Sequence, residues 1–145
     1  MSEAPHDLTR FVDAQDSGNT YDRALTELSN GRKTSHWMWF VFPQIDGLGR
    51  SAMSRRYAIS SLDEARAYLG DPVLGERLRE CARVVAEADS DPQNMFGGID
   101  AMKLQSSMTL FHLAAPEEPV FAAVLGRHYG GMLDTETERR VGPSA

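Results

Sequence analysis

Glycine and proline residues interrupt this sequence at short intervals, and this punctuation constrains the fold more than any other feature. Between the breaks, apolar residues recur every three or four positions, as in Leu74, Leu78, Cys81, Ala82 and Val85. This period places apolar side chains on one face of an α-helix. No segment alternates apolar and polar residues between hairpin turns. The sequence therefore predicts an all-α fold, a single-domain bundle of about six to eight helices.

Start and stop signals locate most of these helices. Ser61 and Glu64 form a capping box that opens one helix, and Asp71-Pro72 opens the next and most regular one. Asp100 is expected to cap a later helix. Further helical segments are expected near residues 8–12, 20–28, 52–58, 91–97 and 119–129.

Two stretches are harder to assign. Residues 35–44 read SHWMWFVFPQ, and their aromatic content favours a strand, whereas their helical surroundings favour a buried helix. We predict a helix over residues 35–42, because Pro43 disfavours helical geometry in the residue before it. Residues 132–145 are expected to be a frayed tail, so the helical core covers residues 7–131.

Length and composition indicate one soluble domain over residues 1–145. The single cysteine, Cys81, cannot form an internal disulfide. The first ten residues resemble no secretory signal, and no apolar run approaches the roughly 20 residues of a membrane span, so we expect a cytoplasmic protein without membrane association. The histidines lack the spacing of metal ligands, and we expect neither a metal nor a cofactor.

Charge is distributed unevenly along the chain. From Arg32 to Arg56 there are five basic residues and one acid, a net charge of +4, which leaves −10 for the rest of a chain whose total is −6. An acidic protein is a poor partner for an extended nucleic acid. A local basic segment suits a small anionic ligand, although it is also consistent with an ordinary solvated face.

The basic segment begins with the first candidate site, formed by Arg32, Lys33, His36, Trp37 and Trp39. Residues two apart on a helix point about 200° apart, so one indole can be buried while the other flanks a cleft. An aromatic wall beside basic groups suits a planar anion such as a nucleotide. The alternative is a buried helix in which backbone groups satisfy both indole N–H groups.

The second candidate site follows Gly97-Gly98 and comprises Asp100, Lys103, Ser106 and Ser107. Glycines allow close backbone approach, and the start of a helix offers free N–H groups to an anion. Lys103 would supply a positive charge that pairs with the bound anion. In the structural alternative Asp100 caps the helix, and the serines let neighbouring helices approach closely.

These motifs also carry a family resemblance. Residues 31–44 (GRKTSHWMWFVFPQ), Gly47-Leu48-Gly49 and residues 100–111 resemble a widespread bacterial and fungal family, domain of unknown function 1810, sometimes mislabelled calpastatin. The resemblance runs from about residue 7 to 131 and departs at Gly98-Ile99, where relatives tend to carry polar residues or proline. It implies an all-helical fold with several helices packed around a central one, and no established reaction.

The leading functional hypothesis is a helical domain that binds a small anionic, nucleotide-derived ligand between the two candidate sites. His36 would exchange a proton, Lys103 would hold the anion, and an indole would stack on a ring. Whether the chain is an enzyme stays open at this stage. The alternative is a structural or protein-interaction module whose motif residues only fix the packing of helices.

Overall fold

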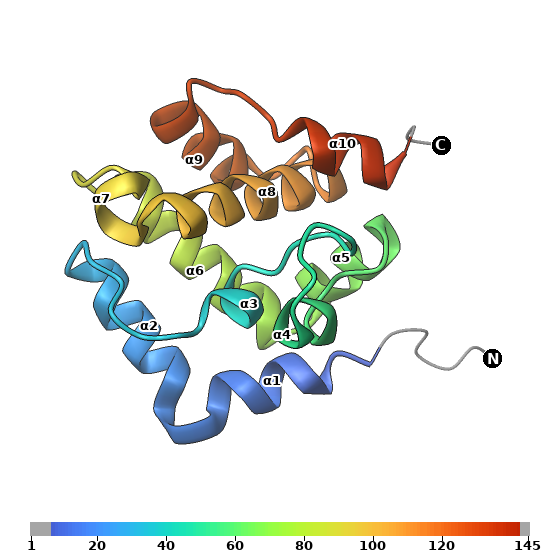
Figure 1. Cartoon of the computed structure of the whole chain (residues 1–145), viewed down its shortest axis with the longest axis horizontal. Coiled ribbons are helices and arrows are strands. Elements are labelled where there is room, and N and C mark those ends of the chain that lie inside the picture. Colours follow the sequence, from blue (N-terminus) through green and yellow to red (C-terminus); the bar gives the residue numbers. More distant parts are fainter. Residues whose placement is uncertain (1–6, 143–145) are drawn as a thin grey trace.

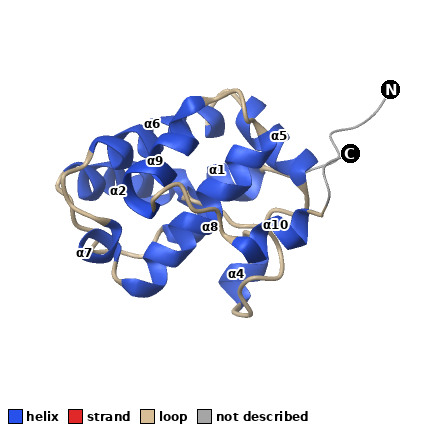
Figure 2. Cartoon of the chain, turned by 90° about the horizontal axis from the view of Figure 1, so that it is seen from above, coloured by secondary structure: helices blue, strands red, loops and turns tan. Residues whose placement is uncertain are grey.

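The computed structural model describes residues 7–142, and these residues confirm the all-α, single-domain prediction (Figures 1 and 2). They form ten α-helices, of which α3, α4 and α7 have only four or five residues, and a short 3-10 turn, η1. In chain order the elements are α1 (Thr9–Asp16), η1 (Ser17–Asn19), α2 (Thr20–Ser29), α3 (Met38–Val41), α4 (Ala52–Arg56), α5 (Leu62–Gly70), α6 (Leu74–Glu87), α7 (Pro92–Phe96), α8 (Gly98–Ala114), α9 (Pro119–Tyr129) and α10 (Thr135–Val141).

Helix α8 is the centre of the bundle. It packs against α5, α7, α9 and α10, and Figure 1 shows it running between α9 and α10 on one side and the earlier helices on the other. Six consecutive residues, 106–111, are buried, so this part of α8 has no face turned to solvent. A helix buried on all sides shows no amphipathic stripe, because every face meets apolar neighbours.

The segment before α3 differs from the prediction. Only Met38–Val41 are helical, whereas a helix was predicted over residues 35–42. Residues 33–37 form a loop whose backbone donors are used elsewhere: the amide of Lys33 donates to the Met95 carbonyl oxygen at 2.8 Å. Trp37 therefore sits at the start of the helical turn rather than inside a buried helix.

Helix α8 also begins earlier than predicted. Gly97, with φ of +85°, is the residue before the helix, and Gly98 is its first residue. Asp100 therefore lies in the first turn instead of capping it, and its carboxylate is directed at lysine side chains. Glycine suits position 97 because a positive φ is costly for other residues.

The end of the chain is more ordered than predicted. Residues 132–145 were expected to fray, but α10 spans Thr135–Val141 and packs on α8. The carboxylate of Asp134 accepts the Thr137 amide at 3.0 Å, which satisfies a donor at the start of the helix. The buried Thr137 side chain anchors the helix to the core. Residues 143–145 lie outside the described part.

Two further observations complete the fold. None of the helices in residues 7–142 has the length and apolar character that crossing a membrane would require. Ile45 and Ile59 form an isolated parallel bridge that ties the loop after α3 to the loop after α4. This bridge fixes residues 44–49 beside the core, where they contribute to the site described next.

Candidate functional site

A buried carboxylate organises the loop that contains the first candidate site. Glu27, on the last turns of α2, is only 8% exposed. Its oxygens accept hydrogen bonds from the Thr34 amide at 2.8 Å, the Ser35 amide at 3.1 Å, the Ser35 hydroxyl at 2.6 Å and the Trp37 indole N–H at 2.8 Å. These four donors fix the path of residues 34–37 and the orientation of the indole.

The same hydrogen bonds determine the ionisation of Glu27. Burial by itself would raise the pKa of the carboxyl group. The donors of Ser35, Thr34 and Trp37 stabilise the charged form more strongly, and they hold the pKa at about 2, below its ordinary value of 4.5. Glu27 is therefore ionised at neutral pH, and its charge is stabilised by uncharged hydrogen-bond donors.

Trp37 belongs to the core. Its side chain is fully buried and lies edge-on to Phe96, with ring centroids 6.3 Å apart. A ligand cannot stack on a ring that is covered on both faces. The indole N–H is satisfied by the Glu27 carboxylate, whereas the structural alternative expected a backbone partner.

Lys33, Asp100 and Lys103 form a charged triad that joins the two candidate sites. The Lys33 Nζ lies 2.8 Å from Oδ2 of Asp100, and the Lys103 Nζ lies 3.8 Å from Oδ1 of the same carboxylate. The side chains are 10% to 23% exposed. Two segments more than sixty positions apart in the sequence thus meet at one carboxylate.

Each lysine of the triad lies over one of the tryptophans. The Lys33 Nζ is 5.4 Å from the centroid of the Trp37 ring, and the Lys103 Nζ is 5.2 Å from that of Trp39. Cation–π contacts at this range hold an ammonium group without neutralising it. Trp39, which is only partly buried, therefore supports Lys103 at the surface.

Lys103 lines a hollow of about 360 Å³, which we call the Lys103 hollow. Its walls come from the loop after α3, the first half of α8 and the start of α10. The residues that line it are Gln44, Leu48, Gly49, Ile99, Met102, Lys103, Ser106, Asp134 and Glu136. A volume of this size is at the lower end of the range for small-molecule sites.

The two serines of the second candidate site have different environments. The Ser106 hydroxyl donates to the Met102 carbonyl oxygen at 3.2 Å and to Asp134 Oδ2 at 3.1 Å, so it links α8 to the start of α10. Ser107 is fully buried, and its hydroxyl has no hydrogen-bond partner among residues 7–142. Ser106 lines the Lys103 hollow and Ser107 does not.

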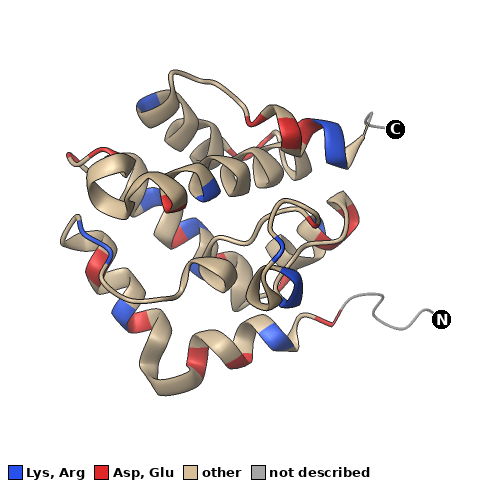
Figure 3. Cartoon of the chain, viewed as in Figure 1, with Lys and Arg blue, Asp and Glu red and all other residues tan. Residues whose placement is uncertain are grey.

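Arg32 and His36 are not brought into this arrangement. Both side chains are exposed, and neither lines the Lys103 hollow. The remaining basic residues are dispersed: Figure 3 shows Lys and Arg positions interleaved with acidic ones along the ribbon, and Arg55 and Arg56 lie on α4. Of the nine candidate residues, Lys103 and Ser106 line the hollow. Asp100 and Trp39 contact Lys103, and Lys33 pairs with Asp100.

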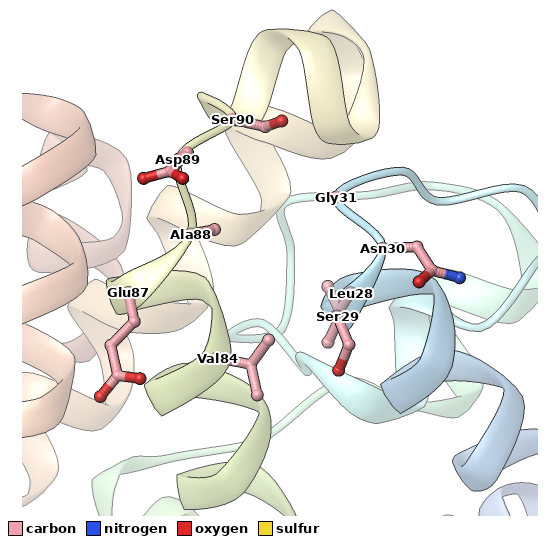
Figure 4. A pocket seen from close by; sticks show the side chains of 9 residues that line it. All are labelled: Leu28, Ser29, Asn30, Gly31, Val84, Glu87, Ala88, Asp89 and Ser90. Carbon is pink, nitrogen blue, oxygen red and sulfur yellow. The ribbon is translucent and has the colours of Figure 1, made fainter.

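A second hollow, of about 450 Å³, lies between the ends of α2 and α6 (Figure 4). It contains none of the candidate residues. Its acidic side chains, Glu87 and Asp89, extend away from α2 in Figure 4, so their carboxylates do not converge on one point. This hollow offers no concentrated charge to a ligand.

Sequence reasoning missed Glu27 and seven of the nine residues that line the Lys103 hollow. Glu27 lies in an ordinary amphipathic helix, and nothing in its local sequence indicates that a loop seven residues later folds onto it. Asp134 was detectable, because Asp134-x-x-Thr137 has the spacing of a helix cap. Gln44, Leu48 and Gly49 belong to the motifs that carried the family resemblance, although no role was assigned to them.

Comparisons with known proteins agree with the family resemblance. A family model described as "Protein of unknown function (DUF1810)" matches residues 5–141. The crystal structure of the conserved hypothetical protein Rv1873 from Mycobacterium tuberculosis superposes with a TM-score of 0.88 at 48% identity, over 92% of this chain and 95% of that chain. No curated protein matches the chain. With a family model that matches nearly its whole length, the chain belongs to the DUF1810 family of proteins of unknown function.

Proposed function

We propose that the chain binds a small anionic ligand in the Lys103 hollow. The observation that carries this proposal is the position of the Lys103 side chain. It lines the hollow, and its Nζ lies 5.2 Å from the centroid of the Trp39 ring. The cytoplasm remains the location that we predict from the sequence.

The charges around the hollow support an anion rather than a cation at Lys103. Lys33 and Lys103 share the single carboxylate of Asp100, so the triad has one positive charge in excess. Lys33 makes the shorter contact, and Lys103 at 3.8 Å is the less neutralised of the two. An anion that displaces water from Lys103 would complete the pairing.

The acidic residues of the hollow are already engaged by the protein. Asp134 Oδ2 accepts hydrogen bonds from the Thr137 amide, the Thr137 hydroxyl and the Ser106 hydroxyl. Glu136 pairs with Arg139 and Arg140. These contacts leave Lys103 as the group in the hollow with the greatest need for a counter-charge.

The proposal includes no reaction. A proton-transfer role for His36 stays a prediction from the sequence, since this side chain lines no part of the hollow. Stacking of a nucleotide base on Trp37 is not part of the proposal, because that ring is fully buried.

A titration with simple anions tests the proposal. Inorganic phosphate and acetate are added separately to the isotopically labelled protein, and amide chemical shifts are followed by NMR. We expect saturable shifts for residues of the hollow such as Gly49, Met102 and Lys103. Lys103→Gln should weaken binding at least tenfold, because Lys103 is the one cation among the described residues that line the hollow.

A matched control separates the site from net charge. Arg23→Gln removes one positive charge from an exposed position on α2, and it should leave anion binding unchanged. Shifts that are equally weakened by both substitutions, or that spread over the whole surface, would contradict the proposal.

A second candidate function is a protein-interaction module. It is favoured by three large apolar side chains that are 75%, 69% and 68% exposed, those of Ile99, Met102 and Met132. Ile99 and Met102 line the same hollow, and adjoining exposed apolar side chains of this kind are typical of interaction sites. Sedimentation of the protein at increasing concentration tests this idea for a second copy of the chain: a dimer that Met102→Asp dissociates would favour it.

A further inference from the structure

We propose that the ligand of the Lys103 hollow is an amphipathic monoanion, a molecule with one acid group and an aliphatic body, of the class of short- to medium-chain carboxylic acids. This inference rests on the proposed function and specifies its ligand. It follows from the apolar side chains beside Lys103, from the carboxylates in the lining of the hollow, and from the lack of an open aromatic face on Trp37.

Apolar side chains form one wall of the hollow. Ile99 and Met102 lie one helical turn apart on α8, and Leu48 contributes from the loop after α3. Ile99 and Met102 are 75% and 69% exposed, so each leaves a large apolar surface in contact with water. A ligand that covers this surface gains the free energy of removing it from water, roughly in proportion to the area covered.

The positive charge is next to this wall. Lys103 lines the same hollow and lies four residues after Ile99 on α8, a spacing that makes the two side chains neighbours, and its ammonium group is held over Trp39. One cation beside aliphatic side chains complements one acid group attached to an aliphatic chain. A fully polar anion such as phosphate would use Lys103 and leave the apolar wall exposed.

Carboxylates in the lining of the hollow oppose a second negative charge. Asp134 and Glu136 both line it. Asp134 cannot swing away easily, since its Oδ2 holds Ser106 of α8 and Thr137 of α10. A diphosphate or triphosphate long enough to fill the hollow would bring its second charge toward Asp134, which accepts only neutral donors among the described residues, and like charges repel at short distance.

The aromatic residues do not offer a stacking platform for a base. Trp37 is fully buried, and Lys103 already lies over the ring of Trp39. The hollow therefore lacks the feature that most favours a nucleotide, and its wall of Leu48, Ile99 and Met102 favours a flexible aliphatic chain.

A homologous series of ligands tests this inference on the intact protein. Acetate, butanoate, hexanoate and octanoate, each below its micelle concentration, are titrated while the amide shifts of Ile99, Met102 and Lys103 are followed. We expect the dissociation constant to fall about two- to fourfold for each added methylene, because a fully buried methylene corresponds to about fourfold. AMP and ATP should bind no more tightly than inorganic phosphate.

Three controls identify the source of this dependence. Lys103→Gln should weaken octanoate binding at least tenfold, and octylamine, which has the opposite charge, should bind more weakly than octanoate. Replacing both Ile99 and Met102 by Ser should flatten the dependence on chain length. Val73→Ser removes an apolar side chain that is 39% exposed at the start of α6, and it should leave that dependence intact.

The outcomes separate the two proposals. Binding of acetate and phosphate at Lys103 with no effect of chain length, or tighter binding of AMP, would overturn the amphipathic ligand and leave the proposed function standing. Failure of every anion to shift the Lys103 region would overturn both. Octanoate binding that Lys103→Gln leaves unchanged, or that octylamine matches, would show nonspecific apolar binding and also overturn the inference.

Discussion

Replacing Glu27 by Gln is the most informative test of how this structure holds its motif loop. The substitution keeps the size and one acceptor oxygen of the side chain but removes the charge that four donors surround. Three of these donors, the amides of Thr34 and Ser35 and the indole N–H of Trp37, point at a single oxygen, Oε1. The amide side chain can still accept them, although more weakly than a carboxylate.

The pKa of Glu27 gives the magnitude. The fall of the pKa from 4.5 to about 2 means that the folded protein stabilises the ionised carboxylate, relative to the protonated group, more than the unfolded chain does. Each tenfold change in proton affinity corresponds to about 1.4 kcal/mol, so ionised Glu27 contributes about 3 kcal/mol to the free energy of unfolding at neutral pH. We expect Glu27→Gln to lower this free energy by about 2–3 kcal/mol at pH 7.

The pH dependence supplies an internal check. Because the folded pKa of Glu27 is depressed, its contribution is complete above the unfolded pKa of about 4.5 and is lost as the pH falls toward 2. The variant has no titrating group at this position. The difference in stability between wild type and variant should therefore be constant from pH 7 to about 5 and shrink below that, while other carboxylates titrate equally in both proteins.

Urea unfolding at a series of pH values measures this difference. Tryptophan fluorescence is a direct probe, since both tryptophans of the chain, Trp37 and Trp39, lie at this loop. A variant as stable as wild type at pH 7, or a difference that does not change between pH 7 and 3, would refute the assignment of Glu27 as an ionised, buried acceptor.

Two further predictions concern packing and reactivity. A Cβ at Gly75 would lie 2.2 Å from the Leu69 carbonyl oxygen, so Gly75→Ala should destabilise the protein by about 1–3 kcal/mol. A Cβ at Gly126 in α9 would meet no atom within 4 Å, so Gly126→Ala should stabilise the protein by about 0.5–1 kcal/mol. Thermal melts of the two alanine variants should therefore shift in opposite directions, and an unchanged Gly75→Ala would disprove the close approach. Burial raises the pKa of the Cys81 thiol to about 12, so native Cys81 should resist alkylation at pH 8 and react only on unfolding; rapid labelling of the folded protein would contradict this.

The sequence predicts elements whose boundaries are set by local chemistry. Ser61 accepts the Glu64 amide at 3.2 Å as the capping box requires, and Asp91 accepts the Asn94 amide at 2.9 Å before a proline-initiated turn. Such contacts join residues three apart, so the residues that determine them are visible in a short window of sequence.

The prediction is wrong where distant contacts decide the backbone. Residues 35–44 fit both helical and strand patterns, but the Glu27 carboxylate accepts the Thr34 and Ser35 amides and holds the first part of this stretch as a loop. Asp100 has the sequence signature of a cap, yet its carboxylate pairs with Lys33 from the loop before α3. In both cases a charged group selected a partner on another element, and periodicity contains no information about that choice.

The same difference between local and distant contacts applies to the candidate site. Lys103 and Ser106 were identified because they follow Gly97-Gly98 on a predicted helix whose start could bind an anion. Their meeting with residues 44–49 depends on the Ile45–Ile59 bridge and on α10, neither of which the sequence analysis predicted. His36 was selected for its chemistry alone, and it lies at the surface outside the hollow.

The complete enclosure of residues 106–111 has a consequence for how the chain folds. Helices α5, α7, α9 and α10 contact α8 directly, and α6 packs on two of them, α5 and α9. A fragment that ends before Gly98 would lack these buried side chains. We therefore expect residues 7–142 to unfold in one cooperative transition.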